Sequence, residues 1–274
     1  DCAVGANQRG AATADRKKGR SGANGREGEQ MSRAAAFFDL DGTLFDGYVW
    51  RALRRHHEAH RFMLPMLYAY LVSHIALWPL KNAKIIREEF FYRAWAANMA
   101  WLVRGVRVER AQLIWEWVTD KEIMPNLRPE MRERIAHHRA EGHRIILLSG
   151  TFLPLLKVIA LHLGVDGAVG TLLAQQDGSY TGQIIQPLSV GMGKVIRLHE
   201  YLSGAGQGID LASSFLYTDA FVDAPVLEIV GHPVVVYPDV RLATLASQRG
   251  WQVIGTTTRE HPSIFFGPRL RSTK

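Results

Sequence analysis

The chain has 274 residues, 47% of them hydrophobic, so it can bury a full core as one domain with an insertion or as two domains. Its formal net charge of +7 favours anionic substrates or surfaces but does not specify nucleic acid, which we do not expect as a partner. Cys2 is the only cysteine, which excludes an intramolecular disulfide and a cysteine nucleophile in the core and fits a reducing, cytoplasmic compartment.

Both ends of the chain are expected to lie outside the fold. Residues 1–30 contain no aromatic residue, leucine or isoleucine, so we predict a disordered tail over residues 1–31. These residues also lack the hydrophobic segment of a secretory signal. Met31 precedes the first predicted strand, and we expect the natural start there, a genuine disordered tail being the alternative. Residues 259–274 are predicted as a C-terminal tail.

The first predicted strand, residues 34–38, ends directly at the segment DLDGT of residues 39–43. Residues i and i+2 of a strand point the same way, so Asp39 and Asp41 can act on one ligand. Gly42 and Thr43 then turn the chain. Two carboxylates held together suit a metal ion and a phosphoryl group, whereas the plainer interpretation is a strand followed by an Asx turn.

About a hundred residues separate this segment from the next motif, far more than a crossover between strands requires. The last of them, residues 128–141, are predicted as a core helix, with Pro129 in its first turn and Gly142 beyond its end. Residues 48–125 are therefore expected to form an inserted helical region. Such insertions can exclude water from a site and choose its substrate.

Within the insertion, residues 62–80 carry no charged side chain and are flanked by Arg61 and Lys81. A buried helix, a membrane-interface helix and a spanning helix are the three interpretations. A span would place Asp39 and Asp219 on opposite sides of the membrane, which argues against it. For the membrane-interface interpretation, Leu67 and Leu71 are the candidate lipid-facing residues.

Aromatic residues and histidines also concentrate in the insertion. Six of the seven tryptophans lie there, which is typical either of a membrane-interface belt or of a seam between packed helices. They are Trp50, Trp78, Trp95, Trp101, Trp115 and Trp117. His56, His57 and His60 are predicted to form a solvated helix face rather than a metal cluster, because no cysteine or carboxylate pattern accompanies them.

A second strand is predicted over residues 143–148, followed by Ser149, Gly150 and Thr151 and then by a helix from Phe152. A hydroxyl group and free backbone amides at a helix N-terminus form an anion site. Ser149 and Gly150 are therefore candidate phosphate-binding residues.

Lys194 lies at the start of a predicted helix that extends to residue 202. A nucleotide P-loop is excluded, because Leu188 and Val195 stand where that motif needs glycine and serine or threonine. An ordinary surface lysine is the alternative interpretation.

A further short strand is predicted over residues 215–219, ending at Asp219. Asp223 follows four residues later, and Pro225 begins another helix. Asp223 is interpreted either as part of the site or as a helix N-cap.

Taken in order, these four segments resemble the four motifs of the haloacid dehalogenase (HAD) superfamily, most of whose members are Mg²⁺-dependent phosphatases. Residues 217–239 and a predicted hairpin around Asp177 and Gly178 resemble its phosphoserine-phosphatase-like branch, subfamily IB. The resemblance implies an α/β fold with a doubly wound, mainly parallel sheet. Its core would comprise residues 32–47 and 126–258, with residues 48–125 as a helical cap.

The resemblance agrees with the chemistry of the residues. Asp39 would attack phosphorus and form an aspartyl-phosphate, and Asp41 would act as general acid and base. Mg²⁺ would be bound by Asp39, the backbone carbonyl of Asp41 and Asp219. Ser149 would hold phosphate oxygens.

The remaining roles follow in the same way. Lys194 would supply a second positive charge, and Gly150 would bind phosphate with Ser149. Asp223 would orient metal-bound water or Lys194.

The sequence thus predicts a Mg²⁺-dependent phosphomonoester hydrolase, acting on a small metabolite phosphate or a phospholipid headgroup phosphate. A phosphotransferase using the same intermediate and a noncatalytic membrane-associated protein with this fold are the alternatives. Phosphoserine phosphatases usually carry a glutamate shortly after the first motif, whereas residues 43–50 offer only Asp46, which argues against phosphoserine. We expect a cytoplasmic protein with peripheral membrane contact through the cap as an option, and the sequence indicates no oligomeric state.

Overall fold

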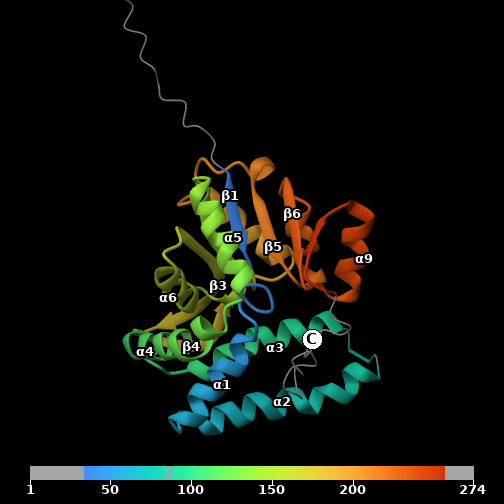
Figure 1. Ribbon diagram of the computed structural model, residues 1–274. Coiled ribbons are helices and arrows are strands. Elements are labelled where there is room, and N and C mark those ends of the chain that lie inside the picture. The colour runs from blue at the N-terminus through green and yellow to red at the C-terminus, as the bar shows by residue number, and fades with distance from the viewer. Residues whose placement is uncertain (1–33, 84, 87, 257–274) are drawn as a thin grey trace, which may run out of the picture. The chain divides into compact units, whose positions relative to one another are not determined.

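The computed structural model describes residues 34–83, 85–86 and 88–256, so the predicted tails lie outside the described residues. Within these ranges the chain forms a seven-stranded sheet in the order β4-β3-β2-β1-β5-β6-β7 (Figure 1). Every neighbouring pair is parallel except β3 and β4, which form the predicted hairpin. The prediction of a mainly parallel α/β sheet is confirmed. The strands are β1 Ala35–Phe38, β2 Arg144–Phe152, β3 Gly167–Gln176, β4 Ser179–Ile185, β5 Phe215–Thr218, β6 His232–Val236 and β7 Gln252–Ile254.

Helices cover both faces of this sheet, and the alternation of side chains along β1 shows why. Ala36 and Phe38 belong to one buried apolar cluster, whereas Ala35 and Phe37 belong to another. A strand buried on both faces reads as an unbroken apolar run, as residues 34–38 do. The helices that pack on the two faces are α5 Pro129–Ala140, α6 Leu153–Leu163, α7 Met192–Leu202, α8 Ala224–Leu227 and α9 Val240–Arg249.

The insertion between β1 and α5 is helical, as the sequence predicts. It contains α1 Val49–Ala59, α2 Leu64–Asn82, α3 Glu88–Asn98 and α4 Val108–Val118, with short 3₁₀ or π turns at Met99–Val103, Thr119–Ile123 and Met124–Asn126. Figure 1 shows α1, α2 and α3 beyond the end of the sheet at which β1 ends. The insertion therefore lies at the carboxyl ends of the parallel strands, where ligands bind in folds of this class.

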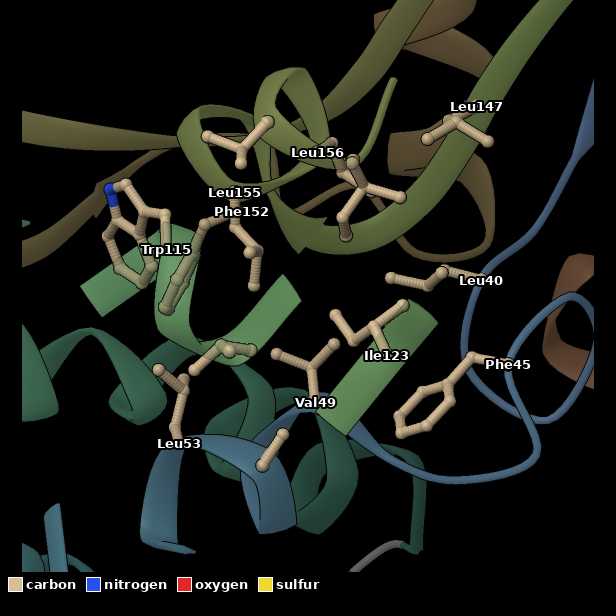
Figure 2. Packing of buried hydrophobic residues seen from close by; sticks show 14 of the residues in the cluster. Leu40, Phe45, Val49, Leu53, Trp115, Ile123, Leu147, Phe152, Leu155 and Leu156 are labelled. Carbon is tan, nitrogen blue, oxygen red and sulfur yellow. The ribbon is translucent and has the colours of Figure 1, made fainter. Parts of the chain in front are cut away.

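Apolar side chains join the insertion to the sheet layer. Val49 and Leu53 of α1 lie near Trp115 of α4, and Phe152 and Leu155 approach the same cluster from β2 and α6 (Figure 2). All five side chains are buried. Because one continuous cluster runs through both parts, the division into a core and a cap at residues 48 and 125 stays a prediction.

Backbone hydrogen bonds also attach the insertion to the β3–β4 hairpin. The amide of Gly105 donates to the carbonyl of Tyr180 at 2.7 Å, and the amide of Tyr180 donates to the carbonyl of Val106 at 2.9 Å. Val108 adds a bond to the carbonyl of Gly178 at 3.0 Å. Packing and hydrogen bonding together hold the insertion against the sheet and its β3–β4 hairpin.

The tryptophans of the insertion mostly fill seams between helices. Trp50, Trp95 and Trp115 are buried, and the rings of Trp50 and Trp95 meet edge to face at 5.4 Å. Trp101 and Trp117 are partly buried against the same cluster, whereas Trp78 is exposed. The interpretation as a packing seam accounts for most of them.

The prediction of a solvated histidine face is wrong for His56 and His57, which are both buried. The two ring nitrogens of His57 contact the carbonyl oxygens of Leu53 and Leu102 at 2.7 and 2.8 Å. Residue 102 lies on a separate segment of the insertion, so this contact could not be read from the helical pattern of residues 49–59.

Candidate active site

Asp39 and Asp41 follow β1 directly and are held by backbone amides. The amide of Asp39 donates to the carbonyl of Tyr217 in β5 at 2.9 Å, which continues the strand pairing by one residue. The buried carboxylate of Asp39 accepts a hydrogen bond from the amide of Leu40 at 2.7 Å. Asp41 accepts from the amide of Val49 at 2.9 Å, so the first residue of α1 positions this carboxylate.

Gly42 allows the chain to turn against the carboxylate of Asp219. Its φ is +77°, a left-handed conformation that favours glycine, and a Cβ atom there would overlap Oδ2 of Asp219. The hydroxyl of Thr43 donates to the other oxygen of Asp219 at 3.3 Å. Asp219 itself comes one residue after β5. The carboxyl ends of β1 and β5 therefore place Asp39, Asp41 and Asp219 at the same end of the sheet.

Lys194 is buried and forms ion pairs with two of the predicted site residues. Its Nζ atom lies 2.6 Å from Oδ2 of Asp223 and 3.4 Å from Oδ2 of Asp39, and the residue is 1% exposed. The hydroxyl of Thr218 donates to the same oxygen of Asp223 at 2.9 Å. The alternative of a surface lysine is wrong.

Asp223 precedes α8, but its side chain makes no capping hydrogen bond there, so the N-cap alternative is also wrong. Its Oδ2 atom is instead occupied by Lys194 and Thr218. Its buried Oδ1 atom has no hydrogen-bond partner among the described residues. An oxygen of this kind is a candidate acceptor for a bound water or ligand.

Ser149 reaches the site from β2 rather than from a helix N-terminus. Its buried hydroxyl lies near the Asp39 carboxyl and opposes the rise of the pKa of that group. The strand continues to Phe152, which pairs with Thr171, and the hydroxyl of Thr171 donates to the carbonyl of Gly150 at 2.7 Å. These contacts with β3 keep residues 149–151 extended, so α6 begins only at Leu153. Ser149 and Gly150 therefore lie on β2, shortly before the helix that the sequence predicts from Phe152 and whose first residue is Leu153.

The buried charges shift one another. Burial raises the pKa of the Asp39 carboxyl above its ordinary value, although the charge of Lys194 opposes this. Burial, followed by the charge of Asp39, raises the pKa of Asp41 to about 8. Burial and the charges of Asp39 and Asp223 hold the pKa of Asp219 well above its usual range. Burial lowers the pKa of Lys194, but the charges of Asp223 and Asp39 outweigh it and raise that pKa above the ordinary value.

The sequence comparison identifies the family of the chain. The model of the haloacid dehalogenase-like hydrolase family matches residues 36–228. The chain belongs to this family. The match includes every one of the predicted site residues of this HAD protein.

Two curated relatives place this HAD chain among phosphatases. Phosphoserine phosphatase SerB1 of Mycobacterium tuberculosis is 31% identical over 226 residues, which cover 80% of this chain and 70% of the relative. Histidinol-phosphatase of Neisseria meningitidis is 30% identical over 159 residues, or 57% of this chain and 71% of the relative. The resemblance to the phosphoserine-phosphatase-like branch is confirmed, and the chain is a HAD-type phosphatase that acts on a phosphate ester.

A solved structure supports the fold. It is the crystal structure of a protein with unknown function from Bordetella pertussis Tohama I, with a TM-score of 0.69 and 26% sequence identity. The similarity covers 82% of this chain and 99% of that one. The HAD-like α/β architecture therefore extends over most of the residues described.

HAD phosphatases generally use Mg²⁺, and the donor atoms of this site fit that ion. Mg²⁺ prefers oxygen ligands and binds through one or two carboxylates, keeping waters and phosphate oxygens in its other positions. Asp39 and Asp219 supply two carboxylates, and the charges of neighbouring aspartates help to raise the pKa of each. No group of three or more histidine, cysteine or acidic side chains in the described ranges could hold a metal by itself. Two carboxylates at the ends of β1 and β5 are a number that Mg²⁺ commonly takes from a protein.

Sequence reasoning missed three side chains that adjoin the site. Thr218 bonds to Asp223 and lies 3.4 Å from Asp39, while Thr43 bonds to Asp219. The hydroxyl of Tyr48 is buried and has no hydrogen-bond partner in the described part of the chain. Burial and the charges of Asp219 and Asp41 raise the pKa of Tyr48 above its ordinary value. Only their positions in the sequence could have pointed to them: Thr218 precedes Asp219, Thr43 lies two residues after Asp41, and Tyr48 precedes α1.

Proposed function

We propose that this chain is a Mg²⁺-dependent phosphomonoester hydrolase that acts through an aspartyl-phosphate on Asp39. The observation that carries the proposal is the buried contact between Asp39 and Lys194, beside Asp41, at the carboxyl end of β1. A carboxylate in that position can act as a nucleophile, and the lysine offsets the charge of an arriving phosphoryl group.

In the first step, a carboxylate oxygen of Asp39 forms a bond to phosphorus while the bond from phosphorus to the ester oxygen breaks. The departing oxygen takes a proton from Asp41, whose pKa of about 8 keeps it largely protonated at neutral pH. A positioned general acid of this kind accelerates such a step by roughly 10²–10⁴-fold. Lys194 and Ser149 would orient the phosphoryl group by hydrogen bonds to its oxygens, together with the backbone of Gly150.

In the second step, water attacks phosphorus, the bond from phosphorus to Asp39 breaks, and inorganic phosphate leaves. Asp41, now a carboxylate, takes the proton from that water, which restores both residues. Asp223 holds Lys194 in place through the 2.6 Å ion pair. When bound by Asp39, Asp219 and the backbone carbonyl of Asp41, Mg²⁺ supplies charge neutralisation for the phosphoryl group and these carboxylates.

The substrate class is a small metabolite phosphate or a phospholipid headgroup phosphate. Asp46 is the acidic residue that follows the first motif, where phosphoserine phosphatases usually carry a glutamate. Its carboxylate is paired with the guanidinium of Arg128 at 3.1 Å, and Arg128 also donates to the carbonyl of Gly42 at 3.2 Å. Asp46 is thus engaged in holding the turn after β1, which favours a substrate other than phosphoserine. The names of the two relatives keep phosphoserine and histidinol phosphate in any substrate screen.

A phosphotransferase would use the same intermediate but pass the phosphoryl group to an alcohol instead of water. Product analysis with an added alcohol separates the two activities, because transfer would yield a new phosphate ester in place of inorganic phosphate. A noncatalytic protein with this fold would show no turnover under any of these conditions.

The test begins with release of phosphate from an activated aryl phosphate by the full chain. We expect turnover with Mg²⁺, its loss on chelation, and a fall in kcat of about 10³-fold or more for Asp39→Asn. Asp177→Asn is the matched control, because Asp177 is exposed at the tip of the β3–β4 hairpin, in a left-handed conformation that asparagine also adopts. Full activity in Asp39→Asn would exclude Asp39 as the nucleophile.

A further inference from the structure

One side of α2 exposes a stripe of large apolar side chains. Val72 is 62% exposed and Ile75 is 48% exposed. Tyr68, Val72 and Ile75 recur at spacings of four and three residues and form this stripe, and Trp78 and Leu80 are also exposed towards the end of α2. Soluble surfaces carry single apolar residues routinely, but several large apolar side chains exposed along one helix mark an interaction site.

The opposite side of α2 packs on the rest of the insertion. Leu67, Tyr70 and His74 are buried there, and Leu71 is partly buried. The expectation that Leu67 and Leu71 face lipid is therefore wrong. The spacing of Tyr68, Val72 and Ile75 places them on the side of the helix that α1 and α3 leave uncovered.

Length and hydropathy limit what this stripe can do. Among the described residues, no helix is long and apolar enough to cross a membrane. A helix that exposes one apolar face and buries the other against protein can instead lie in the plane of a membrane surface. Tyr68 and Trp78 stand ten residues apart on α2, and amphipathic aromatic rings of this kind prefer the membrane–water interface.

The charged residues that flank α2 directly in the sequence are basic, whereas Glu88 and Glu89 open α3. No aspartate or glutamate occurs between Glu58 and Glu88, whereas that interval contains four basic residues, Arg61, Lys81, Lys84 and Arg87. Positive charges beside an apolar face are attracted to anionic lipid headgroups. Two copies of this face brought together would oppose positive charge to positive charge. The charge pattern therefore favours an anionic lipid surface over a second copy of the chain.

We propose that the exposed face of α2, centred on Val72 and Ile75, docks the protein in the plane of an anionic lipid membrane. This inference goes beyond the proposed hydrolysis and does not depend on it, because it rests on residues of the insertion that take no part in the predicted chemistry. The insertion would carry the active site to the membrane surface while the sheet stays in water.

The test measures co-sedimentation of the full chain with phosphatidylcholine vesicles containing about one-third phosphatidylglycerol. Wild-type protein should bind these vesicles, and it should bind pure phosphatidylcholine vesicles more weakly. The double variant Val72→Asp, Ile75→Asp should bind the anionic vesicles at least about ten-fold more weakly than wild type, because it places two charges in the apolar layer. Leu161→Asp is the matched control on α6, since Leu161 is 80% exposed but lies outside the stripe.

Separate measurements of melting temperature and turnover show whether the variants still fold and still catalyse. Both variants should keep the wild-type melting temperature and the wild-type rate on a small aryl phosphate. Should the double variant unfold, Val72→Cys in a Cys2→Ser background, labelled with an environment-sensitive fluorophore, should brighten on anionic vesicles. The same label on Leu161→Cys should not respond.

Three results would overturn the proposal. The first is a wild-type protein that ignores anionic vesicles, and the second is equal binding by wild type and the double variant. The third is a wild-type dimer that the double variant converts to a monomer without any vesicle binding, because the stripe would then be an interface between two copies. Phosphatase activity on the aryl phosphate can persist in all three, so failure of this proposal is distinguishable from failure of the proposed hydrolysis.

Discussion

The active-site edge and the outer face of α2 depart from the usual distribution of side chains in opposite directions. At the site, Lys194, Asp39 and Asp223 are charged groups taken out of water. On α2, Val72 and Ile75 are apolar groups left in water. Both arrangements cost free energy in an isolated protein, the first through desolvation and the second through exposed apolar surface.

The two regions differ in how that cost is offset within the chain. The buried charges satisfy one another through the ion pairs of Lys194 and the hydroxyl of Thr218, so the site is largely preassembled. Val72 and Ile75 stay exposed in the described part of the chain, and the proposed membrane contact would offset their cost. Proteins break the local rules mainly at functional sites, which is why we propose chemistry for one region and membrane docking for the other.

The largest effect should come from removing the cation of the site. Lys194→Met leaves two acidic side chains buried without their counter-charge, and we expect the free energy of unfolding to fall by about 3–5 kcal/mol. Turnover of the aryl phosphate should also fall by about 10²-fold or more, because the charge facing the phosphoryl group is lost. Urea denaturation and steady-state kinetics measure the two effects.

Two further variants control this experiment. Lys157→Met replaces an exposed lysine of α6 and should change stability by less than about 0.5 kcal/mol. Combining Lys194→Met with Asp223→Asn should cost less than the two single changes together, since the double variant no longer buries an unpaired charge at residue 223. Strict additivity would show that the ion pair does not stabilise the fold.

A second prediction concerns the insertion, which buries neutral histidines where the site buries charges. Burial, with smaller contributions from His57 and His60, lowers the pKa of His56 to about 4. At His56 the unfolded chain therefore binds more protons than the folded one between pH 6.5 and 4, so the contribution of this residue to stability should fall as the pH is lowered through that window. At about 1.36 kcal/mol per pKa unit, the loss from His56 is about 1–3 kcal/mol.

Urea denaturation at several pH values measures this slope. His56→Gln removes the titrating group and should flatten the dependence between pH 6.5 and 4. His199→Gln should leave it unchanged, because His199 is an exposed residue of α7. If the slope is the same in all three proteins, His56 does not carry the acid sensitivity.

The smallest expected effect is at the turn that joins the site to the insertion. Gly42→Ala forces a left-handed backbone on alanine, at about 1–2 kcal/mol, and also presses its Cβ atom against Asp219. Turnover should therefore fall by about ten-fold or more, because Asp219 must move from its place beside Asp39.

Gly142→Ala provides the matched control. Its φ of +74° is close to that of Gly42, but a Cβ atom there meets nothing within 4 Å. Gly142→Ala should lose only the stability that a left-handed alanine costs, and it should keep full turnover. Equal kinetics in the two variants would show that the contact between Gly42 and Asp219 does not position the carboxylate of Asp219.

The sequence by itself determined the class of the fold and predicted most of the side chains that the structure brings to the candidate site. Apolar runs that end in Asp39, Ser149 and Asp219 predicted parallel strands delivering functional groups, because strand and turn preferences are local. The core helix was also predicted to within one or two residues at each end, since Pro129 and Gly142 mark its limits chemically.

Only the tertiary structure decided which partners these groups have. The ion pair of Lys194 with Asp223 joins residues 29 positions apart, and the pairing of β2 with β3 moved the start of α6 to Leu153. Burial of His57 depends on the carbonyl of Leu102, 45 residues away. No local pattern encodes such contacts, because they form only when separate elements pack together.

The same reason applies to α2. Residues 62–80, which include most of α2, carry no charged side chain, so hydropathy alone could not distinguish the face that packs on the insertion from the face that meets solvent. Packing against neighbouring helices buried Leu67 and exposed Val72. The sequence supplied an apolar helix, and the tertiary structure decided which of its faces remains available to a membrane.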